Sequence, residues 1–373
     1  MLARWWKYKV LIVFILTFAI ACAVHIHYAM RHELIDQTVW ANAVDDTALG
    51  GIFHPPHNYG ATSIIADPAY LYPGTTILMP AVFLYDLGLS DTNAIRISFS
   101  VVLALFIALA CAASIAFFRK PSWSIPLIAV LLFGAPYIGA TLGSALTIPL
   151  FVLLMILFSA IVEARSRGSV PAQLVCGTGI AGGLALASRL DMSAIFLGTG
   201  LVMLWMTDRK SALSVALISF ASFFLFDPFA WSPIRYILIL HSEMMRQEHI
   251  SFMGASFWAE NLVLPYSLWP LAFASAGILL IFRRTVLPIP PRVISWIIVA
   301  MICTVIVIFS ASSRRPWYFS PYIILWEVLL LPIVGSLIDA LPLKSARASD
   351  ILQYFLAGGL AFVFTYPFNS NFS

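Results

Sequence analysis

Repeated apolar stretches long enough to cross a lipid bilayer restrict the fold of this chain more than any other feature. A helix needs about 20 predominantly apolar residues to cross the hydrocarbon. Hydrophobic residues make up 61% of the 373 residues and charged residues only 10%, more apolar surface than one soluble core can bury. We therefore predict an all-α, polytopic transmembrane bundle over residues 1–373. Its spans number about eleven and cover residues 10–28, 92–118, 125–142, 146–162, 174–188, 193–206, 212–226, 262–282, 293–310, 318–338 and 351–364.

The segment 75–87 is apolar but short, so it predicts either a short span or a helix lying at the membrane surface. The basic residues between spans distinguish the two. If 75–87 does not cross, these residues all fall on one side, as cytoplasmic Lys and Arg do. We therefore expect a surface helix within a first outer loop, 29–91, and a second long outer loop at 227–261. The residues on the basic side are Arg4, Lys7, Lys9, Arg119, Lys120, Arg165, Arg167, Arg209, Lys210, Arg283, Arg284, Arg292, Lys344 and Arg347.

The amino-terminal segment imitates a cleaved signal peptide, with basic residues, an apolar stretch and Ala21-Cys22-Ala23. The apolar run continues beyond this site to Tyr28, which favours an uncleaved first span with a cytoplasmic amino terminus. The four cysteines all lie in apolar stretches without C-x-x-C spacing, so neither a disulfide nor a zinc site is indicated.

The predicted outer side collects the histidines, most of the acidic residues and several arginines that depart from the positive-inside pattern. An arginine near the depth of lipid headgroups needs a partner, and a phosphate matches the paired donors of its guanidinium. Pairing with acids such as Asp191, or snorkelling to water, is the alternative for any one arginine. The departing arginines are Arg31, Arg96, Arg189, Arg235, Arg246, Arg314 and Arg315.

Residues 35–49 of the first outer loop predict a short amphipathic helix along the membrane. The segment lacks Gly and Pro, has Ile35, Val39 and Ala43 at helical spacing, and is followed by Gly50-Gly51. Asp36 stands at its amino-terminal end, where the helix dipole favours an ionised carboxylate. Helix capping is therefore the structural alternative to a catalytic role for this residue.

The order of these features resembles the GT-C glycosyltransferases, in particular bacterial relatives of the protein mannosyltransferases and lipid A aminoarabinose transferases. The resemblance rests on the Asp-led helix, the Gly-Gly stop, HPPHNYG at 54–60, the Pro- and Tyr-rich approach from residue 66 to the span ending before Lys120, and SRRPWYFSPYIILWEVLLLPIVG at 313–335. These parts cover about a third of the chain. Where the family's loop often has an Asp-Glu pair, this chain has Asp36-Gln37.

The resemblance implies transfer of a sugar from a polyprenyl-phosphate carrier to an acceptor hydroxyl on a glycan, lipid or protein. One carboxylate acts as general base and cations stabilise the departing phosphate. Asp36 matches the base, with Asp46 second and Asp67 third. Arg314 and Arg315 match the family's phosphate-binding entry to a late span, Arg189 and Arg96 join them by topology, and Tyr318 could donate a hydrogen bond. Trp40, Asp67, Tyr70 and His57 are the substrate-binding candidates, although an aromatic belt also explains the rings.

Three alternatives stay open at this stage. The outer histidines and acids suit a divalent metal, but no recognisable ligand spacing occurs, so we expect no cofactor. A transporter or flippase would need charge near the midplane, and only Glu327 lies well inside a predicted span. An inactive scaffold in a membrane assembly is the third. We expect contact with membrane lipids and not nucleic acid, in a bacterial inner membrane with the active side periplasmic.

Overall fold

Every element that the structure describes is an α-helix. The computed structural model describes residues 2–31, 75–118 and 142–227, together with positions 37, 41, 44, 124, 125, 127, 128, 131, 132, 298, 299, 302, 351, 352, 355 and 359. No β-strand occurs among these residues. The helices are α1 (Leu2–Arg31), α3 (Thr75–Asp86), α4 (Asp91–Phe118), α7 (Leu142–Ser166), α8 (Ala172–Ser188), α9 (Leu190–Thr207) and α10 (Arg209–Phe226).

Four stretches within these helices are long and apolar enough to cross a membrane: Tyr8–Arg31, Asp91–Phe118, Ala145–Ser166 and Arg209–Phe226. Shorter apolar helices lie between them. The prediction of a helical integral membrane protein is therefore confirmed for the part of the chain that the structure describes. The total of about eleven spans stays a prediction, because most of the chain after residue 227 lies outside the described residues.

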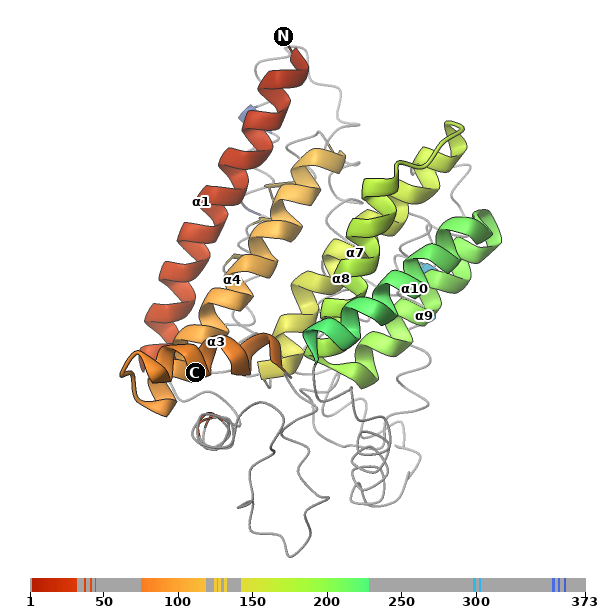
Figure 1. Ribbon diagram of the computed structural model, residues 1–373. Helices are drawn as coiled ribbons and strands as arrows, with labels where there is room; N and C mark the ends of the chain where they lie inside the picture. Colours follow the sequence, from red (N-terminus) through yellow and green to blue (C-terminus); the bar gives the residue numbers. More distant parts are fainter. Residues whose placement is uncertain are drawn as a thin grey trace, which may run out of the picture.

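The long helices pack side by side, and α1, α8 and α10 run in one direction while α4, α7 and α9 run in the opposite one (Figure 1). α1 lies along α4, α4 contacts α7, α7 contacts α8, and α8 packs against α10. The amino terminus of α1, the turn between α7 and α8, and the turn between α9 and α10 lie at one end of the bundle, the upper end in Figure 1. We call it the basic end, because Arg165, Arg167, Arg209 and Lys210 lie there.

α7 occupies the centre of the bundle, whereas α1 and α10 lie at its periphery. In α7, 83% of the most apolar window is buried, compared with 17% in α1. The ring of Phe151 stacks on that of Phe196 in α9 at 4.3 Å between centroids. On α10, Leu213, Leu217 and Phe220 are exposed at helical spacing, which is the pattern of a lipid-facing stripe.

Three glycines of α8 allow its backbone to approach α10 closely. A Cβ atom built on Gly179 would lie 2.5 Å from the side chain of Ile218, and one on Gly183 would lie 2.4 Å from the Cβ of Ser222. A Cβ atom built on Gly182 would lie 2.4 Å from the hydroxyl oxygen of Ser219. Small residues at such contacts are typical of helix pairs in membranes, where close packing replaces the hydrophobic effect as the source of association.

α3 is the short helix that the sequence predicts over 75–87, and it packs against α4 at the end of the bundle opposite the basic end (Figure 1). Its 12 residues extend about 18 Å, too little to cross about 30 Å of hydrocarbon. The Ser98 hydroxyl of α4 donates to the Ile77 carbonyl at 2.5 Å and holds α3 against α4. Its location at a membrane surface stays a prediction.

Candidate active site at the α3 end of the bundle

The amino terminus of α4 places Arg96 beside α3. α4 starts after Gly88, which has a φ of +96° in the turn from α3. The Asp91 carboxylate accepts from the backbone N–H of Thr92 at 2.6 Å, and the Ser90 hydroxyl accepts from that of Asn93 at 3.3 Å. Polar groups at a helix start satisfy backbone donors that have no partner within the helix. The capped start defines the position of Arg96 in the second turn of α4.

Arg96 joins the segment between α1 and α3 to the bundle. Its Nε–H donates to the Oε1 of Gln37 at 2.7 Å, across 59 residues of sequence. Gln37 is only 8% exposed, whereas Arg96 is half-buried. A hydrogen bond to a charged donor contributes more than one between neutral groups, about 1.5 to 3 kcal/mol. The bond therefore brings a candidate phosphate-binding arginine to the residue next to Asp36, the candidate base.

Three positions of the loop segment are described, and the amphipathic helix predicted over 35–49 stays a prediction. Gln37, Ala41 and Val44 are helical, and all three are buried. Their i, i+4 and i+7 spacing puts them on one face of a helix. The face predicted from Ile35, Val39 and Ala43 lies outside the described residues.

Arg189 and Asp227 also lie at this end, between α8 and α9 and at the end of α10. Arg189 has an extended backbone (φ −164°), and its N–H continues the ladder of α8 by donating to the Ala185 carbonyl at 3.0 Å. Arg189 is 2% exposed and Asp227 is 1% exposed. Arg189 is thus buried among the helices, and its predicted contact with a phosphate stays a prediction.

Sequence analysis gave no role to Gln37 or to buried Asp227. One feature of the sequence could have indicated Gln37: it occupies the position where the resembled family often has Glu. Asp227 carried none, because an acid directly after an apolar stretch is ordinarily exposed. The remaining candidates lie outside the described residues and stay predictions: Asp36, Trp40, Asp46, His57, Asp67, Tyr70, Arg314, Arg315 and Tyr318.

The described residues of this end include an arginine, a side chain that suits recognition of an anion. Among the described residues, no three His, Cys, Asp or Glu side chains form a group that could hold a metal ion. The bond to Gln37 uses only one of the N–H donors of the Arg96 guanidinium. The remaining donors of a guanidinium match phosphate oxygens. No family model matches the chain, and no curated protein sequence matches it significantly.

Proposed function

We propose that the chain is a membrane glycosyltransferase that takes a sugar from a polyprenyl-phosphate carrier and transfers it to an acceptor hydroxyl at the α3 end of the bundle. The observation that carries the proposal is the 2.7 Å hydrogen bond from Arg96 to Gln37. It links a cation suited to the donor phosphate with the loop residue that follows the candidate base, Asp36. The resemblance to the GT-C glycosyltransferases supports the same reaction.

In the proposed reaction, the Asp36 carboxylate takes the proton of the acceptor hydroxyl as its oxygen attacks the anomeric carbon. A new C–O bond forms, and the bond between the anomeric carbon and the phosphate oxygen breaks with inversion. The electron pair leaves with the polyprenyl phosphate, whose negative charge Arg96, Arg314 and Arg315 stabilise. The proton then passes from Asp36 to water.

The distribution of charge in the described helices favours this reaction over transport. A transport path requires ionisable residues near the middle of spans. In α4, α7 and α10 the charged residues lie within the first two turns or the last turn, as Asp91, Arg96 and Glu163 illustrate, and α8 contains none. This arrangement leaves the spans apolar between two polar ends and is typical of catalysis at a membrane surface.

The test is consumption of radiolabelled polyprenyl-phosphate sugars by the purified chain in liposomes. Because general bases contribute about 10²- to 10⁴-fold, Asp36→Asn should lower kcat by at least about a hundredfold while donor binding persists. Asp46→Asn should have a smaller effect. Asp86→Asn, which removes an exposed acid at the same end, is the matched control and should retain activity.

Variants of Gln37 test the link between the loop and α4. Gln37→Ala removes the acceptor of Arg96 and should lower kcat/KM about tenfold or more. Gln37→Glu keeps an acceptor and should retain most activity. Donor that crosses the bilayer intact, with no labelled product, would identify a transporter instead. Equal activity of wild type and Asp36→Asn would remove Asp36 from the mechanism.

A further inference from the structure

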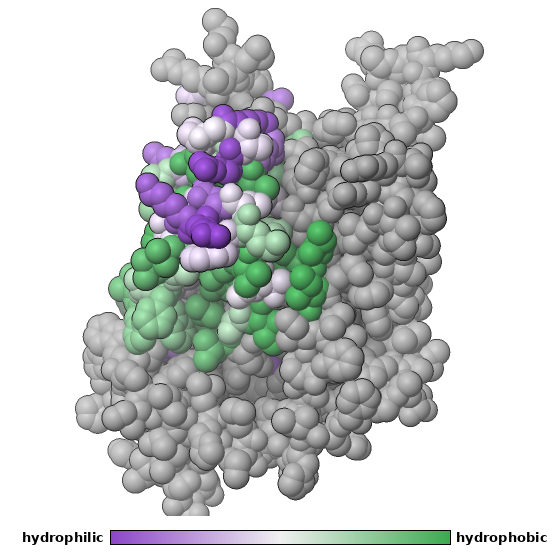
Figure 2. Space-filling view, turned by 90° about the vertical axis from the view of Figure 1, so that its right-hand side faces the viewer, coloured by the Kyte–Doolittle hydropathy of each residue, from purple (hydrophilic) through white to green (hydrophobic). Residues whose placement is uncertain are grey.

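A basic surface surrounds the turn between α9 and α10, at the opposite end of the bundle from the proposed active site. Arg165 ends α7, while Arg209 and Lys210 begin α10, and all three are exposed. Figure 2 shows hydrophilic residues gathered at this end, directly above an apolar face. The two zones meet on one surface of the molecule.

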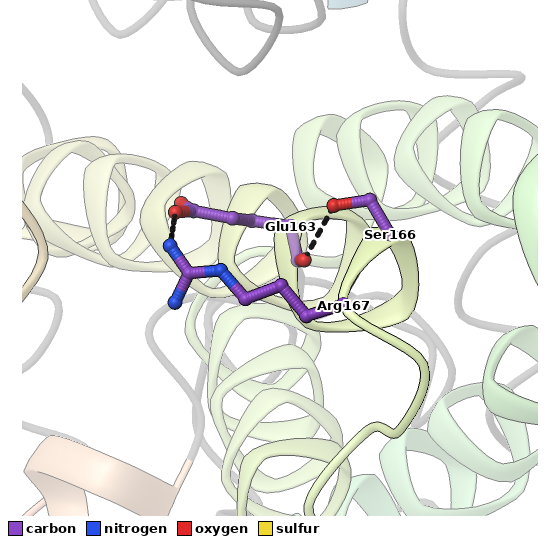
Figure 3. A network of polar contacts seen from close by, with 3 residues as sticks. All are labelled: Glu163, Ser166 and Arg167. Atoms are coloured by element: carbon purple, nitrogen blue, oxygen red, sulfur yellow. Dashed lines mark hydrogen bonds and ion pairs between the residues drawn. The ribbon is translucent and has the colours of Figure 1, made fainter.

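The two described acidic residues near this surface, Glu163 and Asp208, both have an ion-pair or hydrogen-bond partner. The Glu163 carboxylate pairs with Arg167, as Figure 3 shows. The Asp208 carboxylate caps α10: it accepts from the Ser211 hydroxyl at 2.8 Å and from the Ser211 N–H at 3.4 Å. Among the described residues, with Glu163 neutralised by Arg167, the three cations Arg165, Arg209 and Lys210 face one further carboxylate, that of Asp208. The surface therefore has an excess of positive charge.

The apolar zone begins at the last turn of α9. Val202, Trp205 and Met206 are 63%, 50% and 81% exposed. The Arg209 guanidinium carbon lies 5.7 Å from the centroid of the Trp205 ring, within the range of a cation–π interaction. Tryptophan beneath a cation at the end of an apolar helix is typical of the depth where acyl chains meet headgroups.

We propose that this surface, formed by Arg165, Trp205, Arg209 and Lys210, binds the headgroup of an anionic phospholipid. α10 is a candidate membrane span, so its first turn lies at the depth of lipid phosphates. Guanidinium and ammonium groups donate to the phosphate oxygens, and the net negative charge of the headgroup matches the excess cations. The acyl chains lie against Val202 and Met206. The site does not depend on the proposed transferase reaction.

Native mass spectrometry of the purified full chain tests the proposal. The protein is exposed to phosphatidylglycerol and phosphatidylcholine with identical acyl chains, and the bound lipids are counted. We expect wild type to retain phosphatidylglycerol preferentially. Each cation near an anionic headgroup contributes about fivefold, so Arg165→Gln/Arg209→Gln/Lys210→Gln should reduce this preference by about a hundredfold. Trp205→Leu should reduce it about threefold, through loss of the cation–π contact.

The matched control is Glu163→Gln/Arg167→Gln, which removes an ion pair at the same end without changing the net charge and should keep the preference. If the triple variant does not fold, Lys210→Gln alone should still lose about fivefold. Retention of the full preference by a folded triple variant would overturn the proposal. Displacement of the bound lipid by equimolar inorganic phosphate would overturn it too, since that result identifies a phosphate-ion site.

Discussion

Asp208 controls the start of α10 through a single side chain. It follows α9 directly, has an extended backbone (φ −152°), and its carboxylate accepts from Ser211. The hydrogen bond from the Ser211 hydroxyl is the largest cause that lowers the pKa of Asp208 below its usual value, and the charge of Arg165 acts in the same direction. The ionised carboxylate is thus the form that stabilises the turn between the two helices.

The stabilisation by Asp208 should depend on pH. A carboxyl whose pKa is lowered by folding stabilises the protein above its unfolded pKa, and this contribution is lost as the pH falls through the folded pKa. Asp208→Ala should therefore cost about 0.5 to 2 kcal/mol at pH 7, and the difference from wild type should shrink below about pH 4. Thermal unfolding in detergent between pH 7 and pH 3 measures it.

Asp208→Asn provides the control for this experiment, because asparagine also caps helices but does not titrate. Its unfolding temperature, relative to that of Asp208→Ala, should vary little with pH. A wild-type advantage over Asp208→Ala that is constant down to pH 3 would show that charge contributes nothing to the cap.

At the scale of the element, the contact between α8 and α10 depends on glycines of α8 that differ sharply in their surroundings. A Cβ on Gly183 would lie 2.8 Å from the backbone nitrogen of Phe223, and backbone cannot move aside as a flexible side chain does. Gly177 lies on the same helix with no atom within 4 Å of its Cβ position. Substituting each of these two glycines by alanine therefore distinguishes the effect of helix propensity from the effect of packing.

Gly183→Ala should destabilise the bundle and Gly177→Ala should not. Overpacking typically costs about 1 to 3 kcal/mol, whereas alanine in an open helical position gains up to about 1 kcal/mol over glycine. Unfolding in detergent should therefore give a lower Tm for Gly183→Ala than for wild type, and an equal or higher one for Gly177→Ala. Equal Tm values for the two variants would contradict the close approach of α8 and α10.

The two ends of the whole molecule differ in the kind of charge they carry. Arg165, Arg167, Arg209 and Lys210 lie at the α7–α8 and α9–α10 turns of the basic end, while α3 ends with Asp86 and α4 begins with Asp91 at the other end. Lys and Arg accumulate on the cytoplasmic side of membrane proteins. We therefore predict that the basic end is cytoplasmic and the α3 end is periplasmic.

Cysteine accessibility tests this orientation. Asp86→Cys and Arg167→Cys change exposed residues at opposite ends, in a background where the native cysteines are replaced by serine. A membrane-impermeant thiol reagent added outside intact spheroplasts should label Asp86→Cys, and should label Arg167→Cys only after permeabilisation. Labelling of both from outside would refute the threading and the proposed periplasmic reaction with it.

Sequence patterns predicted the helices well where apolar residues continue unbroken, and less well at their ends. The predicted span 92–118 matches Asp91–Phe118 closely. α1 extends from Leu2 to Arg31, beyond the predicted 10–28. The prediction followed only the apolar residues, whereas the hydrogen bonding of the helix continues through polar residues at both ends. α7 begins at Leu142, four residues before the predicted 146–162, through a stretch that contains Gly143 and Ser144.

The sequence by itself determined that this is a helical membrane protein, because lipid demands apolar spans whose backbone polar groups are satisfied within each helix. Its charge pattern also predicted that the segment 75–87 lies at the membrane surface. Only the tertiary structure decided that Arg96 bonds to Gln37, that Arg189 is buried, and which glycines meet α10. Such contacts join residues far apart in the chain, and their geometry depends on how helices pack, which local periodicity does not encode.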